Sequence, residues 1–180
     1  MRKASDEKAA GAESRGEAEA AEEIAVNGHQ EDQGTESWSH DSRYEGDHKH
    51  GRKHGHGKYI WNDGSMYEGT FSENRIHGRG LKIWPDGRKY DGEWKDDNMH
   101  GEGVHTYKDG GIYQGEYKDN QRDGYGIYLY PDGKQYAGWW SNGKQHGEGT
   151  YQKDGRDRKG VWEAGKRVRW LDEENVGLDQ

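Results

Sequence analysis

The sequence predicts an all-β protein, an elongated single-layer antiparallel β-meander of tandem hairpins. Three observations predict it. Five consecutive segments open with tyrosine at a fixed period of 23 residues, at Tyr44, Tyr67, Tyr90, Tyr113 and Tyr136. Each opening alternates with period 2, and each segment contains an Asp-Gly pair of the kind found in tight turns. No segment has the period of an amphipathic helix.

The repeats divide the chain into three parts. Residues 1–43 are acidic and rich in Ala and Glu, and we expect a disordered tail there; a helix over "EAEAAEEIAV" that folds on a partner is the alternative. Residues 44–170 form the meander, with five repeats, a partial capping repeat and roughly ten to twelve strands. Residues 171–180 form a second acidic tail. The first repeat has no evident cap, so we expect its edge to be open to pairing.

Each repeat is predicted to be one hairpin. In the third repeat, residues 90–94 read Tyr-Asp-Gly-Glu-Trp, so the two rings and the glycine between them share one face of a strand. A polar loop leads to Gly101 and Gly103, and a second strand ends at the turn Asp109-Gly110. Repetition of this unit predicts a meander of hairpins along the whole segment.

The predicted core consists of aromatic rings packed over glycine. Only 27% of the residues are hydrophobic, whereas the chain has 30 glycines, 8 tryptophans and 12 tyrosines. One ring buries about 150 Å², too little to offset the ordering of a whole repeat, so neighbouring repeats must stabilise each other. The predicted ladders are the five opening tyrosines and a second row that starts at His48 and continues through Phe71, Trp94, Tyr117, Trp140 and Trp162.

Composition and charge exclude several classes of protein. The chain has no cysteine, so disulfides and thiol catalysis are excluded, and no apolar run approaches the length of a membrane span. The start "MRKASDEKAA" has no apolar segment of a secretory signal, so we expect an intracellular protein, in the cytoplasm, the cytoskeleton or a cilium. The net charge of −8 is concentrated in the two tails, which argues against a nucleic-acid partner.

No catalytic constellation is evident, and we expect neither an enzyme nor a cofactor. The Gly-x-Gly pairs lack a following helix and a Gly-Lys-Ser/Thr sequence, so they are not nucleotide loops. Four histidines occur in "HKHGRKHGHG", residues 48–57, and His54 belongs to the recurring His-Gly of the repeat. A metal site of His48, His50 and His56 is the alternative, but no carboxylate or thiolate is spaced to complete it.

Two sets of exposed residues are candidates for binding a partner. Trp139 falls in a strand position that acids and Thr70 occupy elsewhere, so it points away from the ladders and is a hot-spot candidate. The acids Glu68, Asp91 and Glu116 are expected to line one face, either as ordinary solvated positions or as a strip that receives a basic peptide. Candidates for anionic lipid are the basic residues Lys49, Arg52, Lys53, Lys58, Arg156, Arg158, Lys159 and Arg167.

The unit Tyr-Glu-Gly-x-aromatic, His-Gly-x-Gly, Asp-Gly resembles the MORN (membrane occupation and recognition nexus) repeat, which covers residues 44–155 and, in part, the chain to about residue 170. The resemblance implies a single-layer meander of hairpins. Such arrays occur in radial-spoke head proteins of cilia, parasite cytoskeletal baskets, junctophilins, plant phosphatidylinositol-phosphate kinases and a histone lysine methyltransferase. The layout of this chain is most similar to the stand-alone ciliary and cytoskeletal proteins.

The resemblance and the residues together predict a non-catalytic scaffold, ciliary or cytoskeletal, whose grooved aromatic face receives a peptide or helix of a partner protein. A peripheral module that binds anionic phospholipid is one alternative. A regulatory subunit that docks on an enzyme is another. The sequence defines no oligomeric state.

Overall fold

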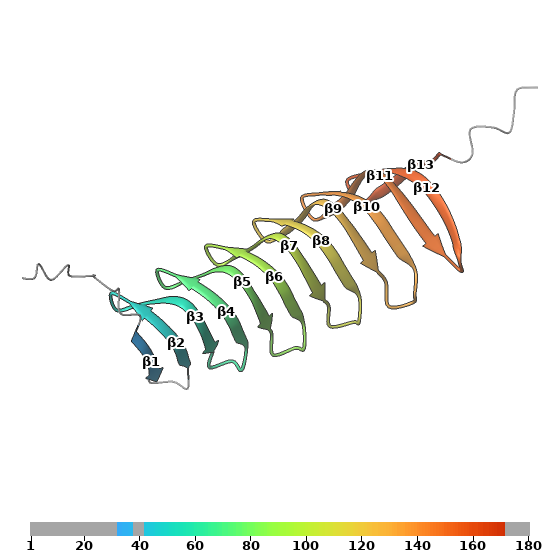
Figure 1. Cartoon of the computed structure of the whole chain (residues 1–180). Coiled ribbons are helices and arrows are strands. Elements are labelled where there is room, and N and C mark those ends of the chain that lie inside the picture. The colour runs from blue at the N-terminus through green and yellow to red at the C-terminus, as the bar shows by residue number, and fades with distance from the viewer. Residues whose placement is uncertain (1–31, 38–41, 172–180) are drawn as a thin grey trace, which may run out of the picture.

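The computed structural model describes residues 32–37 and 42–171. They form one sheet of thirteen strands, each antiparallel to the next along the chain, which confirms the predicted meander. Figure 1 shows the strands side by side along an elongated body. The strands are β1 (Asp32–Ser37), β2 (Arg43–Lys49), β3 (Arg52–Ile60), β4 (Met66–Ser72), β5 (Arg75–Ile83), β6 (Lys89–Lys95), β7 (Asn98–Thr106), β8 (Ile112–Lys118), β9 (Gln121–Leu129), β10 (Gln135–Ser141), β11 (Lys144–Lys153), β12 (Arg156–Glu163) and β13 (Lys166–Trp170).

Strand β1 lies within the segment predicted to be a disordered tail, so that prediction is wrong for residues 32–37. β1 pairs with β2 over its full length, from Asp32 opposite His48 to Ser37 opposite Arg43. The first repeat therefore has a neighbouring strand at the edge that we expected to be open. The rest of the predicted tail, including "EAEAAEEIAV", and residues 172–180 lie outside the described residues.

Two-residue turns join the two strands of each repeat. In the second repeat, Glu73 and Asn74 have φ values of 51° and 70°. Positive φ at both central residues defines a type I′ turn, whose twist matches that of paired strands. The polar loop predicted here is thus the tight hairpin turn itself, and Asn and Asp tolerate its left-handed backbone. The equivalent positions are residues 50–51, 96–97, 119–120, 142–143 and 164–165.

The Asp-Gly pairs form longer turns that connect one repeat to the next. Gly64 has φ 84° and donates its N–H to the carbonyl of Trp61 at 3.0 Å. The carboxylate of Asp63 accepts the N–H of Ser65 at 2.8 Å. The exception is Asp154-Gly155, which forms a two-residue turn. The last repeat unit is therefore one residue shorter than the others, as its sequence spacing indicates.

The core consists of tyrosine rings that cover pairs of glycines on adjacent strands. Tyr90 is 0% exposed, and a Cβ built on Gly103 would lie 2.5 Å from its ring atoms. The hydroxyl of Tyr90 donates to the carbonyl of Glu93 at 3.1 Å, which fixes the ring along its own strand. The other fully buried tyrosines cover glycines in the same way: Tyr44, Tyr67, Tyr113 and Tyr136.

The second row of rings locks consecutive repeats together. Trp94 makes edge-to-face contacts with Tyr90 of its own repeat, at a centroid distance of 5.1 Å, and with Tyr67 of the preceding repeat, at 5.6 Å. Its indole N–H donates to the carbonyl of Gly80 at 3.0 Å. The same row contains the buried rings of Phe71, Tyr117, Trp140 and Trp162.

Trp170 closes the row of rings at the last described strand. Arg158 stands at the position where a sixth opening tyrosine would be, so no ring of β12 covers Gly160 from that position. Trp170 on β13 lies opposite Gly160, and a Cβ on that glycine would lie 3.0 Å from the indole. A ring from the next strand thus replaces the missing tyrosine, and it packs edge-to-face on Trp162 at 6.0 Å.

Candidate partner-binding face

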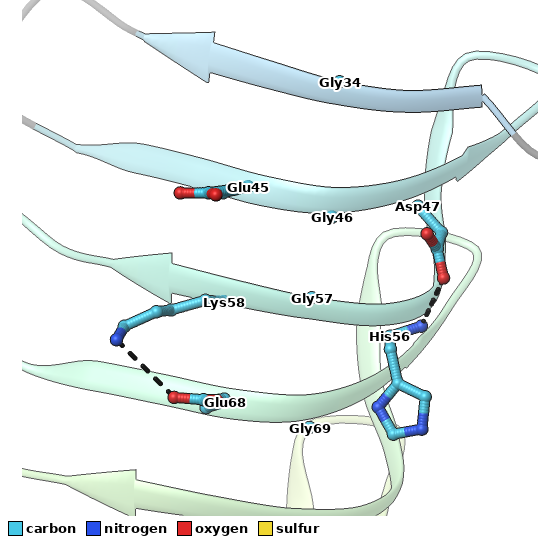
Figure 2. Close-up of a pocket in the computed structure, with 9 residues that line it drawn as sticks. All are labelled: Gly34, Glu45, Gly46, Asp47, His56, Gly57, Lys58, Glu68 and Gly69. Atoms are coloured by element: carbon cyan, nitrogen blue, oxygen red, sulfur yellow. Dashed lines mark hydrogen bonds and ion pairs between the residues drawn. The ribbon is translucent and has the colours of Figure 1, made fainter.

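The sheet has two unlike faces. We call the face of the aromatic rows the ladder face and the opposite one the groove face. On the groove face, two rows of side chains flank a floor of glycine backbone. Figure 2 shows Glu45, Lys58 and Glu68 on one side of the glycines and Asp47 and His56 on the other.

Three hollows follow this floor along the sheet. One of about 670 Å³ lies between β1 and β4 and is lined by Glu45, Lys58 and Glu68 among others. Another of about 300 Å³ is lined by residues of β5–β8, and a third of about 210 Å³ by residues 125–171. We expected the groove on the aromatic face, but these hollows lie on the other one. Because the tyrosine rings fill the glycine gaps, the ladder face is closed there. Hollows of about 520 and 330 Å³ on the ladder face lie nearer the last described strands.

The three candidate acids all lie on the groove face but not in one row. Glu68 pairs with Lys58 at 3.5 Å, and Asp91 is exposed opposite Leu81 and Val104. Glu116 lies in the second row, and its carboxylate accepts the backbone N–H of Tyr125 at 2.9 Å. The expectation of a single strip is therefore wrong for Glu116.

Side chains of this second row cap a β-bulge in the neighbouring strand. The bulge arises at the glycine of each His-Gly, where φ is positive, as at Gly55 with 68°. Asp47 accepts the N–H of His56 at 3.0 Å, in the same manner as Glu116 in the fourth repeat. Thr70 serves the second repeat by donating its hydroxyl to the carbonyl of His77. The polar residue in this position is therefore part of the fold.

Trp139 occupies the same position in the fifth repeat and has no side-chain group that can accept a hydrogen bond. A Cβ added to Gly147, the bulge glycine, would lie 3.7 Å from the Cβ of Trp139. The Trp139 side chain is 53% exposed and makes an edge-to-face contact with Tyr125, which is 47% exposed, at 5.8 Å. In the fifth repeat, Trp139 thus stands in place of the polar cap and forms an exposed aromatic pair with Tyr125.

Further apolar side chains are exposed on the groove face, on β7 and β9. Val104, Ile127 and Leu129 are each more than a third exposed, and they alternate along β7 and β9 with residues that point to the ladder face. Sequence reasoning identified Trp139 but missed Tyr125 and these aliphatic residues. The signal was available, because Tyr125 stands where other repeats have His56, Arg79, Glu102 and Glu148.

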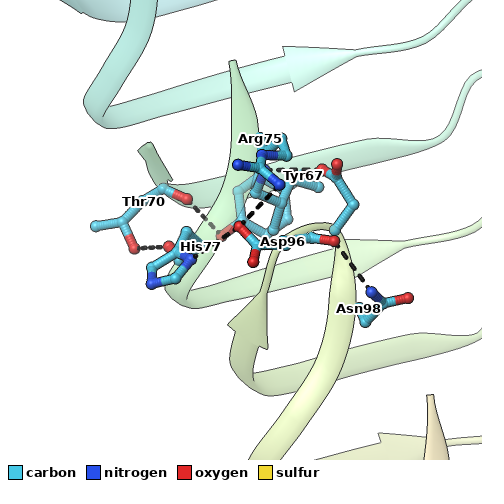
Figure 3. Close-up of polar contacts among 8 residues, drawn as sticks. Tyr67, Thr70, Arg75, His77, Asp96 and Asn98 are labelled. Atoms are coloured by element: carbon cyan, nitrogen blue, oxygen red, sulfur yellow. Dashed lines mark hydrogen bonds and ion pairs between the residues drawn. The ribbon is translucent and has the colours of Figure 1, made fainter. Parts of the chain in front are cut away.

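The histidines of three His-Gly pairs, His54, His77 and His100, contact the turn of the next hairpin. His77 Nδ1 lies 3.6 Å from the carboxylate of Asp96, which also pairs with Arg75 at 3.3 Å (Figure 3). The same contact joins His54 to Glu73 at 3.6 Å. These histidines therefore hold successive repeats together, in agreement with the structural role inferred for His54.

The fourth repeat exchanges the two partners of this contact. Asp123 replaces the histidine, and Asn142 replaces the acid of the turn. The carboxylate of Asp123 accepts the backbone N–H of Asn142 at 3.2 Å. The exchange keeps the contact and avoids placing two carboxylates together.

The alternative metal site is not assembled. His48 lies on the ladder face, edge-to-face with Tyr44 at 5.1 Å, whereas His56 lies on the groove face. His50 is in the turn, with φ 51°. The sequence suggested that these side chains share a face, and the structure contradicts this. Over the described residues, no three His, Asp or Glu side chains are grouped as metal ligands.

The N-terminal group of basic candidates is distributed over both faces. Arg52 pairs with Glu73, and Lys53 lies over the rings of Tyr44 and Tyr59 at 5.3 and 5.5 Å. Lys49 ends β2 beside the turn at residues 50–51, and Lys58 is the partner of Glu68 described above. These residues do not form one cationic surface.

The second basic group lies on β12 and β13. Arg158 and Arg167 stack over Trp170 at 4.0 and 4.2 Å. Arg156 and Arg158 line a hollow of about 520 Å³ on the ladder face, whereas Lys159 lines the third hollow of the groove face. The hollow beside Trp170 is thus the more concentrated cationic feature of the described chain.

One buried histidine is a polar exception within the ladder face. His105 stacks on Tyr107 at 4.2 Å, and its Nδ1 lies 3.3 Å from the hydroxyl of Tyr117. Burial, with the nearby Arg88 and Arg122, lowers the pKa of His105 to about 4. The imidazole is therefore neutral at physiological pH and acts as a packed ring.

No helix of the described chain has the length and apolar character needed to span a membrane. Comparison with curated proteins gave no match. Comparison with protein families matched the MORN repeat at residues 44–66, 67–87, 90–112, 113–135 and 136–158. Each match begins at an opening tyrosine of the ladder, and together they cover more than half of the 180 residues. MORN repeats form a binding-type, non-catalytic family whose members contact proteins or membrane lipids. This chain belongs to the MORN repeat family.

Proposed function

We propose that this protein is a non-catalytic scaffold that binds a partner protein on its groove face. The observation that supports this most is the exposed pair Tyr125–Trp139. Exposed aromatic residues are typical anchors of protein interfaces. Trp139 also replaces a polar bulge cap that Asp47 and Glu116 provide in other repeats, so the fold alone does not account for it.

The substitution Trp139→Glu tests this proposal. Glu93 and Glu116 occupy the equivalent position in the third and fourth repeats, so glutamate at this position is compatible with the fold. We expect unchanged or slightly higher stability, by up to about 1 kcal/mol if the bulge N–H regains an acceptor. Captures from cells that express the tagged full chain should lose their specific partner, measured by quantitative mass spectrometry.

Val168→Glu is the matched control, because Val168 on β13 is similarly exposed and receives the same change. It should retain the partner. Equal recovery of the partner by wild type and Trp139→Glu would contradict binding of the partner on the groove face.

The assembly that contains this scaffold is proposed to be ciliary or cytoskeletal. The support is the layout of the chain, an array of repeats similar to that of stand-alone ciliary and cytoskeletal MORN proteins. Imaging of the endogenously tagged chain should place it on an axoneme or a cytoskeletal structure. A uniformly diffuse signal that detergent extracts completely would contradict this assignment.

Binding of anionic lipid is the second candidate, and the hollow lined by Arg156 and Arg158 favours it. Co-sedimentation with vesicles that contain about a third of anionic lipid should then occur at low salt and weaken as salt screens the charges. Arg156→Gln with Arg158→Gln should abolish it. Sedimentation with neutral vesicles to the same extent, or none with anionic ones, would eliminate this function.

A further inference from the structure

We infer that the segment of the partner bound to the groove face is basic and carries an apolar anchor at one end. The anchor packs on Tyr125 and Trp139, and the Lys or Arg side chains lie over β6–β8. This inference rests on the proposed function and specifies the chemistry of the occupant.

The charges along the glycine floor support this polarity. In the two rows that flank the floor over β6–β8, every charged side chain is a carboxylate: Asp91, Glu93, Glu102 and Glu116. Arg79 of β5 lies opposite Glu93 and lines the same hollow, so Asp91, Glu102 and Glu116 are the acids without a cation opposite them. The lysines of these strands on this face lie at strand ends, outside the two rows. A basic segment is thus complementary to the centre of the face, and an acidic one is repelled.

Two of these carboxylates oppose each other directly. Glu102 of β7 is the cross-strand partner of Glu116 of β8. Like charges in this arrangement destabilise a sheet. Glu116 is explained by the hydrogen bond to Tyr125, whereas Glu102 has no such structural role among the described contacts. A cationic side chain of a partner placed between them relieves the repulsion.

The aromatic anchor lies close enough to act together with these acids. The distance across the sheet from β7 to the midpoint between β9 and β10 is about 12 Å, because neighbouring strands are about 4.8 Å apart. This separation corresponds to about eight residues of a helix or four of an extended chain. One short segment therefore reaches both the Tyr125–Trp139 pair and the acids.

Synthetic peptides test the polarity. The probe is a fluorescent helical peptide of about twenty residues, with Trp and Leu at one end and lysines on the same face about eight residues away. One control peptide has glutamate in place of lysine, and another has serine in place of Trp and Leu. We expect the probe to bind the full chain by fluorescence anisotropy and both controls to bind at least about tenfold more weakly.

Two variants with the same change in net charge separate the site from general acidity. Glu102→Gln removes an acid of the groove face, and Asp154→Asn removes one from an exposed turn, where asparagine tolerates the φ of 52°. Glu102→Gln should weaken probe binding about threefold, whereas Asp154→Asn should leave it within experimental error. Trp139→Glu should weaken it about tenfold or more.

Equal binding of the lysine and glutamate peptides, or equal losses in Glu102→Gln and Asp154→Asn, would overturn the inference. The proposed scaffold function is tested independently, because loss of the native partner in Trp139→Glu is measured by capture from cells and does not depend on binding of the synthetic peptides. Cross-linking of that partner at Tyr125 and Trp139 through a segment without Lys or Arg would reject the inference and leave the scaffold function standing. Binding of anionic vesicles that Trp139→Glu leaves unchanged would assign lipid contact to another part of the surface.

Discussion

At the scale of single residues, the fold depends on pairs of glycines that are covered by a ring. Tyr90 lies over Gly92 and Gly103, and its hydroxyl is bonded within its own strand. The ring replaces two side chains that a conventional sheet would place there. A thin core without many aliphatic residues is possible because the rings fill space that glycine leaves open.

Gly103→Ala is therefore expected to destabilise the protein by about 2–3 kcal/mol, because the new Cβ meets the buried Tyr90 ring at 2.5 Å and overpacks the core. Urea unfolding followed by tryptophan fluorescence measures the change. Gly110→Ala is the control, since nothing lies within 4 Å of its Cβ position and only its φ of 90° is unfavourable, at about 1 kcal/mol. Equal losses in the two variants would contradict steric exclusion by the ring.

His105 makes the stability depend on pH. Its pKa is about 4 in the folded chain and 6.5 without burial, so the unfolded state binds the proton first as the pH falls. The contribution of His105 is complete above pH 6.5 and is lost as the pH falls toward 4, by at most about 3 kcal/mol. Urea unfolding at a series of pH values between these limits should show the loss.

His105→Tyr isolates this effect, because Tyr59, Tyr128 and Tyr151 stand at the same position in other repeats. The variant should be less sensitive to acid than the wild type, whereas both share the titration of the carboxylates. Parallel pH profiles for the two proteins would show that His105 is not responsible.

At the scale of the elements, the type I′ turns also connect neighbouring hairpins. Asn120 accepts the N–H of Met99 with its side-chain oxygen at 2.8 Å and donates its own N–H to the Met99 carbonyl at 3.0 Å. Asn74 forms the same pair of bonds with Lys53. The side-chain amide thus acts as an additional peptide group that extends the pairing of strands beyond the ladder.

Asn120→Gly should cost about 1 kcal/mol, because glycine keeps the left-handed turn but removes the side-chain bonds to Met99 and Asn98. Asn142→Gly is the control, since the side chain of Asn142 bonds only to Ser141 of its own hairpin among the described contacts. Denaturant midpoints compare the two variants. A loss in Asn142→Gly as large as that in Asn120→Gly would assign the effect to backbone entropy.

At the scale of the whole molecule, each repeat is stabilised by its neighbours. Trp94 contacts rings of its own and of the preceding repeat, and His77 contacts the turn of the following hairpin. Consecutive strands pair along the whole sheet, so the number of repeats sets the length of the body. Stability should then grow with the number of interfaces.

Deletion of residues 90–112, one complete repeat, should leave a folded protein, because Tyr113 then takes the place of Tyr90. The body should shorten by two strands, about 10 Å, and small-angle scattering measures this. Deletion of residues 90–101 is the control, because it removes an opening strand and its hairpin turn but keeps the second half of β7, which breaks the alternation of strand directions and the register. A compact globular particle from the first deletion would contradict a linear array.

The sequence by itself determined the class of fold, the period, the aromatic rows and the glycines beneath them. These features depend on alternation along a strand and on repetition at a fixed spacing, and both are local properties of the chain. The outward direction of Trp139 followed from the same alternation.

Only the tertiary structure decided which face is grooved and what the polar positions do. The two-residue turn at residues 50–51 pairs His48 with Lys53, so even-numbered residues change face across the turn, and His48 and His56 lie on opposite faces. Glu116 proved to be a bulge cap. Its hydrogen bond joins β8 to β9, and the sequence alone does not define which residues of two neighbouring strands lie opposite each other. Strand β1 was not predicted, because its sequence contains no aromatic residue. It is defined by its pairing with β2, which the sequence does not reveal.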